Sequence, residues 1–315
     1  MRRYRFVVTS GALVLLCIHA AAQTPDSAQR FFKQAQKKYA VGDLASASED
    51  FSRAIEISSR LDSPKKNASG ASSAQTQFKA ADPAENIRVI DPFTAKAYAG
   101  RGIVKFRQGF LDDAMADFNA ALRIDPRLAM AYVNRGVIYR NRGDLDAACA
   151  DFDRAISINP KMFEPYTNRA DVRLERQDVE GALKDLERAL TLEPSSAETH
   201  SLLGYALLAK NQSDSALSSF KRALEINPQL ASAYHGRGTV QFRRGAFDDA
   251  IADFTRALEL NPEMANAYMN RGLTLMLKGD EAKAREDFER CLTLKPELKA
   301  ELARRIEMAK EVRKP

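Results

Sequence analysis

Seven prolines recur along this chain at a fixed interval of 34 residues. They are Pro92, Pro126, Pro160, Pro194, Pro228, Pro262 and Pro296. A proline has no amide hydrogen and disfavours helical backbone in the residue before it, so each one is expected to end a helix. A period of this length, kept without slippage, is typical of a solenoid built from stacked copies of one supersecondary unit.

Counting back from the prolines gives six contiguous windows that share a residue pattern. The windows are 95–128, 129–162, 163–196, 197–230, 231–264 and 265–298. Window position 4 is tyrosine or His200, position 8 is glycine or alanine, position 20 is alanine and position 24 is phenylalanine or leucine. Positions 4 and 8 share one helical face, and positions 20 and 24 share another. Each window is therefore predicted to form two helices that approach closely at the small residues.

This order of aromatic, glycine, alanine, aromatic and proline strongly resembles the tetratricopeptide repeat. The resemblance covers 95–298 and departs from the family pattern at His200 and at window position 7, where arginine is frequent. It implies an all-α fold, a right-handed superhelical solenoid of antiparallel helix pairs. It also implies that the first helix of each pair lines a concave surface.

The regions on either side of the array extend this organisation. Residues 28–61 match the repeat pattern, with Ser59 in place of the proline. Residues 62–94 lose the periodicity and form a low-complexity insertion or linker, predicted to be solvated over 62–84. Residues 299–315 resemble the first helix of an uncompleted repeat, with a polar outer side. They are predicted to form a capping helix and tail.

The first 22 residues are predicted to be a secretory signal peptide. Three arginines precede an apolar run, and Ala20, Ala21 and Ala22 precede Gln23. Cleavage after Ala22 would give an exported protein, with a bacterial periplasm as the expected location. An uncleaved anchor, secretion, or a lipoprotein modified at Cys17 are the alternatives.

Composition excludes several classes of function. Without the signal peptide the chain has 45 basic and 42 acidic residues, and the excess lies in the C-terminal tail, so no basic stripe favours nucleic acid. No nucleophile elbow, phosphate loop or metal-spaced cluster is present, so we expect no catalytic residue, metal or cofactor. Cys149 and Cys291 are four repeats apart, which argues against a disulfide. Asn67 and Asn211 begin glycosylation sequons, which matter only in a eukaryotic secretory cell.

Window positions 7 and 23 vary together. Every window with arginine at position 7 has aspartate at position 23, whereas window 197–230 has Leu203 and Ser219. We interpret the matched residues as structural ion pairs between the two helices of a repeat, because one partner buried alone would be costly. The predicted pairs are Arg101 with Asp117, Arg135 with Asp151, Arg169 with Asp185, Arg237 with Asp253, and Arg271 with Asp287.

Two sets of residues are candidates for peptide binding. Asn134, Asn168 and Asn270 occupy window position 6, where an amide side chain could bond to a peptide main chain or could instead cap or bridge repeats. Met269, Leu273 and Met276 form an apolar set that suits an adaptable binding surface, or that packs under the capping helix.

These observations predict a non-enzymatic scaffold or adaptor that binds a protein or extended peptide on its concave face. The alternative is a structural subunit of a cell-envelope assembly that uses its convex face and ends. Neither function requires stable membrane insertion after signal cleavage.

Overall fold

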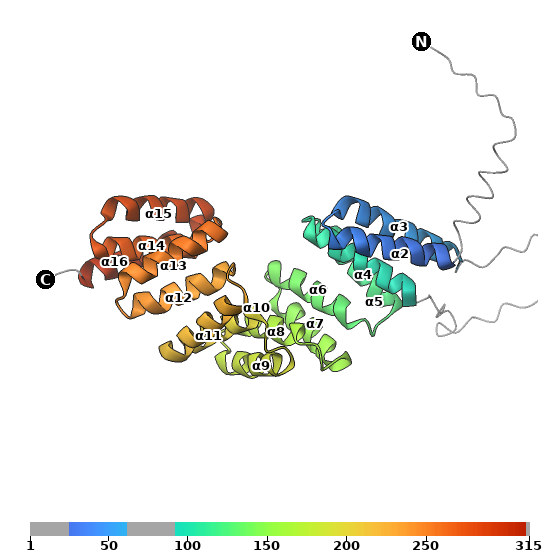
Figure 1. Ribbon diagram of the computed structural model, residues 1–315, viewed down its shortest axis with the longest axis horizontal. Coiled ribbons are helices and arrows are strands. Elements are labelled where there is room, and N and C mark those ends of the chain that lie inside the picture. Colours follow the sequence, from blue (N-terminus) through green and yellow to red (C-terminus); the bar gives the residue numbers. More distant parts are fainter. Residues whose placement is uncertain (1–24, 62–91, 313–315) are drawn as a thin grey trace, which may run out of the picture. The chain divides into compact units, whose positions relative to one another are not determined.

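The structure is a computed structural model that describes residues 25–61 and 92–312. Every regular element in these two ranges is a helix, and the helices pack in successive pairs (Figure 1). The helices divide into two compact units, which meet in the sequence at Asn159 and Pro160. The predicted signal peptide and most of the predicted insertion lie outside the described residues. None of the described helices is long and apolar enough to cross a membrane.

Unit 1 contains three helix pairs. They are α2 (Pro25–Ala40) with α3 (Leu44–Leu61), α4 (Pro92–Arg107) with α5 (Leu111–Ile124), and α6 (Ala129–Asn141) with α7 (Leu145–Ile158). Helix α3 packs directly against α4, and the buried Ser58 and Thr94 hydroxyl oxygens lie 2.6 Å apart. The N-terminal pair therefore stacks on the next pair, although residues 62–91 separate the two in sequence.

Unit 2 contains four helix pairs and a closing helix. The pairs are α8 (Glu164–Glu175) with α9 (Val179–Leu192), α10 (Ala197–Ala209) with α11 (Ser213–Ile226), α12 (Ala231–Arg243) with α13 (Phe247–Leu260), and α14 (Ala265–Lys278) with α15 (Glu281–Leu294). A short 3-10 helix, η1 (Pro296–Leu298), leads into α16 (Lys299–Val312), which packs against α14.

The periodic prolines act at the helix ends as predicted, with one exception. The six residues that precede Pro126 to Pro296 end their helices in extended backbone, with φ between −128° and −143°. Pro92 instead begins α4, a position where a missing amide hydrogen costs no helical hydrogen bond. Helix α4 thus starts three residues before the boundary at 95 that the window count gave.

The small residues at window position 8 are required by the aromatic ring at position 24. A Cβ atom added to Gly136 would lie 2.7 Å from the ring of Phe152, and Gly204 would meet Phe220 at 2.6 Å. Phe118, Phe152, Phe220 and Phe254 are all fully buried in this way. In the core of each such repeat, the ring at position 24 therefore contacts the backbone of the facing helix. A larger residue at position 8 would displace that ring.

Candidate functional site

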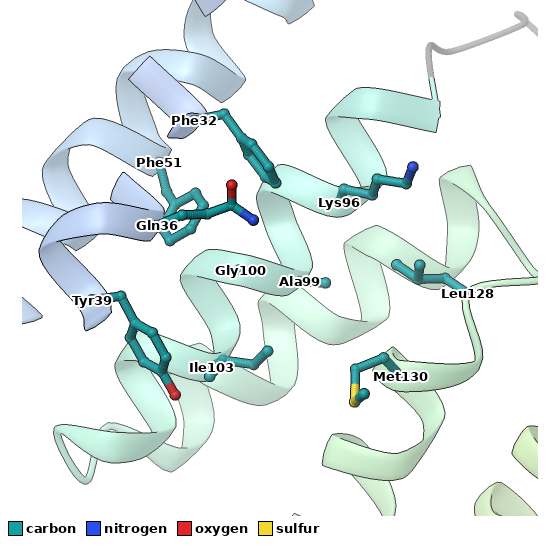
Figure 2. Close-up of a pocket in the computed structure, with 10 residues that line it drawn as sticks. All are labelled: Phe32, Gln36, Tyr39, Phe51, Lys96, Ala99, Gly100, Ile103, Leu128 and Met130. Atoms are coloured by element: carbon teal, nitrogen blue, oxygen red, sulfur yellow. The ribbon is translucent and has the colours of Figure 1, made fainter. Parts of the chain in front are cut away.

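Unit 1 has an open groove along the first helices of its three pairs (Figure 2). We call it the unit 1 groove. Its volume is about 650 Å³, and most of its lining is apolar. The lining residues are Phe32, Gln36, Tyr39, Phe51, Lys96, Ala99, Gly100, Ile103, Leu128 and Met130. They come from α2, α3, α4 and the start of α6, so the groove runs across three consecutive repeats.

A glycine at window position 6 creates the floor of this groove. In the next window the same position holds Asn134. At Gly100 a Cβ atom would lie 2.6 Å from the ring of Phe51. That ring meets Phe32 edge-on, with centroids 5.4 Å apart. The absence of a side chain at Gly100 therefore lets Phe51 reach α4, and two packed aromatic rings form a rigid wall.

Basic side chains lie at both ends of the groove. Lys96 and Tyr39 lie on opposite sides of it (Figure 2). The guanidinium of Arg107 stacks over the Tyr39 ring, 4.7 Å from its centroid. No aspartate or glutamate is among the residues that line the groove. The groove therefore combines an apolar floor with positive charge at its two ends.

The structure brings together the five arginines and aspartates of the predicted pairs. In each pair the arginine Nε and one terminal nitrogen donate to the two oxygens of one carboxylate, at 2.5–2.9 Å. The aspartate side chains are only 5–8% exposed. Each guanidinium also lies over the tyrosine at window position 4, with the ring centroid 5.4–5.8 Å away. The pairs thus fix the first helix of a repeat to the second.

These contacts account for the direction of the arginine pKa shifts. Hydrogen bonding to the partner carboxylate raises the pKa of Arg101, Arg135, Arg237 and Arg271, against an opposing effect of burial. The N-terminal repeat lacks the arginine, and Asp50 pairs with Lys38 at 2.6 Å. In window 197–230, the Ser219 hydroxyl donates to the carbonyl of Ser215 in its own helix. That serine therefore needs no cationic partner.

The side-chain amides of the three candidate asparagines form hydrogen bonds within the chain. The side-chain amides of Asn134 and Asn168 donate to carbonyls one turn back, those of Met130 and Glu164, at 2.8 and 3.0 Å. Asn270 is engaged on both sides: its nitrogen lies 3.0 Å from His235 Nε2, and its oxygen accepts from Arg305 of α16 at 3.4 Å. Asn270 therefore bridges neighbouring repeats, which was the alternative interpretation.

The apolar candidates near the C-terminal end are buried rather than exposed. Met269, Leu273 and Met276 are 3%, 4% and 6% exposed, and they pack in one cluster with Leu302 and Ala309 of α16. These three side chains therefore pack under the closing helix, which was the alternative interpretation. The reason is that α16 supplies the first helix of a further repeat and covers the face that the array would otherwise leave open.

Sequence reasoning missed a buried polar network around His235. The Tyr205 hydroxyl donates its hydrogen to the Ser232 carbonyl at 2.6 Å. His235 Nδ1 lies 2.9 Å from the same hydroxyl oxygen. Because the hydroxyl hydrogen is already used, His235 Nδ1 is the protonated ring nitrogen and donates to that oxygen. His235 Nε2 then accepts from Asn270. Burial lowers the pKa of His235 to about 4 and raises the pKa of Tyr205. The three side chains of this network, from Tyr205, His235 and Asn270, occupy three different window positions, so the repeat pattern gave no signal of it.

A second feature absent from the sequence interpretation is the unit 1 groove itself. Its aromatic residues belong to the repeat at 28–61, which a segment of 30 residues separates from α4 in the sequence. The sequence feature that could have indicated this groove is a glycine at window position 6, which occurs at Gly100 and Gly236. Both glycines adjoin a phenylalanine of the preceding repeat, Phe51 and Phe220, and both of those repeats lack the arginine at position 7.

Comparison with known structures finds relatives at the level of the fold. A tetratricopeptide repeat protein from Parabacteroides merdae aligns with a TM-score of 0.60 and 18% identity, over 90% of this chain and 99% of that one. A chain of the APC/C hetero-tetramer Cut9–Hcn1 aligns with a TM-score of 0.63 and 14% identity, over 89% of this chain and 55% of that one. PilF of Pseudomonas aeruginosa aligns with a TM-score of 0.54 and 19% identity, over 66% and 97% of the two chains.

Comparison with protein families gives the identification. No curated protein sequence matches the chain. The family model of the tetratricopeptide repeat matches residues 91–162, 167–231 and 235–298, which together make up more than half of the chain. These segments contain the periodic prolines and the Arg–Asp pairs described above. The chain therefore belongs to the tetratricopeptide repeat family.

Proposed function

We propose that this protein is an exported scaffold that binds a protein or an extended peptide partner in the unit 1 groove. The tetratricopeptide repeat fold supports a protein-interaction scaffold in general. One relative of the same fold is a chain of the APC/C hetero-tetramer Cut9–Hcn1. The observation that carries the proposal is an open apolar groove across three stacked repeats.

The size and chemistry of the groove support this choice. A volume of about 650 Å³ falls within the range of about 300–1,000 Å³ that is typical of ligand sites. Met130, which is 41% exposed, is one of four large apolar side chains that the described residues leave exposed. Exposed methionine beside rigid aromatic rings is typical of surfaces that accept apolar side chains of a partner. In contrast, Met269, Leu273 and Met276 are already covered by α16.

Photo-crosslinking in cells tests the location of the binding site. A crosslinking amino acid placed at Ile103 lies in the groove, and one placed at Arg123 lies on the exposed side of α5. We expect a discrete protein adduct from Ile103 and none from Arg123, and mass spectrometry would identify the partner. Adducts from Arg123 alone would contradict the proposal and would favour an envelope subunit that uses its outer faces.

Export is tested by the N-terminus of the protein recovered from cells. We expect the N-terminal peptide to begin at Gln23, because the small residues at 20–22 suit signal peptidase. Mass spectrometry of the protein from the cell envelope fraction would measure this. A chain that retains the residues before Ala20 would contradict cleavage and leave the uncleaved anchor as the explanation.

A further inference from the structure

We propose that the unit 1 groove selects an extended segment of about five residues, with apolar side chains in the middle and an acidic residue at each end. This inference rests on the proposed function, because it assigns a partner chemistry to the same groove. It is carried by the spacing and the missing counter-charges of two basic residues, Lys96 and Arg107. Neither residue belongs to the Arg–Asp pairs that stabilise the repeats.

The two basic residues mark the ends of one stripe along α4. Lys96, Gly100, Ile103 and Arg107 follow each other at intervals of three or four residues, so they share one face of the helix. Eleven residues of helix separate the two charges, which is about 16 Å at 1.5 Å per residue. An extended chain advances about 3.3 Å per residue, so about five residues span this length. The length of the stripe therefore sets the length of the ligand.

Neither charge has an acidic partner in the described part of the chain. No carboxylate of those residues forms an ion pair with Lys96 or with Arg107, whereas five arginines of the first helices each pair with an aspartate. Arg107 is nevertheless held in place by stacking on Tyr39. An ordered guanidinium beside an apolar floor is suited to a carboxylate supplied from outside. Charge complementarity thus favours acidic residues at the ends of the bound segment.

The floor between the charges accepts apolar side chains. Phe32, Ile103 and Met130 line the groove together with Gly100. The Phe32 and Phe51 rings pack with their centroids 5.4 Å apart, and the Gln36 amide lies beside Phe51 in Figure 2. Two or three apolar side chains of a bound segment would remove this surface from water. Gln36 supplies the amide that can bond to the main chain of the segment.

Fluorescence anisotropy with two labelled peptides tests the inference. The peptide Asp-Leu-Val-Phe-Asp is compared with the same core flanked by lysines, using the protein purified after expression of the full chain. We expect the acidic peptide to bind at least about tenfold more tightly at low salt, and the ratio to fall as salt screens the two charges. The double variant Lys96→Glu/Arg107→Glu should reverse the preference. The matched variant Arg123→Glu, on the exposed side of α5, should leave it unchanged.

Two results would overturn the inference. Equal affinity for the two peptides would show that Lys96 and Arg107 do not select acidic residues. If Ile103 still crosslinks a partner in that case, the proposed function is retained and only this inference is lost. Light scattering gives the second result. If the protein is a dimer that dissociates in the variant Lys96→Glu/Arg107→Glu but not on addition of the acidic peptide, the groove binds a second copy of the chain instead. Absence of any adduct at Ile103 would instead count against the proposed function itself. Circular dichroism of each variant confirms that the helices are intact.

Discussion

Replacing Asp151 with alanine should lower the free energy of unfolding by about 3 kcal/mol. The Asp151 carboxylate accepts two hydrogen bonds from Arg135, and its side chain is 8% exposed. Its removal leaves the Arg135 guanidinium, which is only 20% exposed, without its negatively charged partner. Arg135 keeps its bond to Asn119 at 2.7 Å, which places the loss at the low end for a broken buried pair. Urea unfolding followed by far-UV circular dichroism measures it.

The matched control removes both partners. Arg135→Leu combined with Asp151→Ser copies the natural arrangement of Leu203 and Ser219, where the serine hydroxyl bonds to its own helix. This double variant should lose only about 1 kcal/mol, because no buried charge is left without a partner. Equal losses in the single and double variants would show that the pair contributes through packing alone.

Lowering the pH from 7 to 5 should destabilise unit 2 by about 2 kcal/mol through His235. Its pKa is about 4 in the folded protein and about 6.5 in an unfolded chain, so the unfolded state binds more protons between these values. The contribution of the neutral, buried imidazole is therefore complete above pH 6.5 and is lost as the pH falls toward 4. Protonation would also place a hydrogen on Nε2, which accepts from Asn270 in the folded state.

Replacing His235 tests this effect directly. In His235→Gln the unfolding free energy should change by about 2 kcal/mol less between pH 7 and pH 5 than in the parent chain, whatever the loss of stability at pH 7. An unchanged slope in His235→Gln would contradict the assignment.

The fold could be predicted because its determinants repeat. Proline acts on the backbone next to it, and glycine at the turn within a pair adopts φ of 75–94°. The two windows without that glycine use Gln177 and Asn211 with φ of 63° and 59°, so the turn geometry persists when the residue changes. The co-variation of window positions 7 and 23 predicted that Arg135 lies opposite Asp151 for the same reason, because the two helices of every repeat pack with the same geometry.

The candidate site was less predictable because it depends on contacts that occur once. Asn270 was chosen from its window position, but His235 and Arg305, each 35 residues away, take up its amide. Met269 was chosen from its chemistry, but the closing helix covers it. The unit 1 groove needs the repeat at 28–61 to stack on α4, a contact that the irregular segment between them conceals in the sequence. Such long-range contacts break the repeat symmetry, and they define where a partner can bind.

Methyl NMR of the full chain, titrated with the partner segment captured at Ile103, is the most direct test of the groove as the binding surface. The methyl groups of Ile103 and Met130 line the groove, whereas those of Ile57 and Met115 are buried in the second helices α3 and α5. We predict that the signals of Ile103 and Met130 shift on binding and that those of Ile57 and Met115 stay in place. Shifts confined to Ile57 and Met115 would contradict the account.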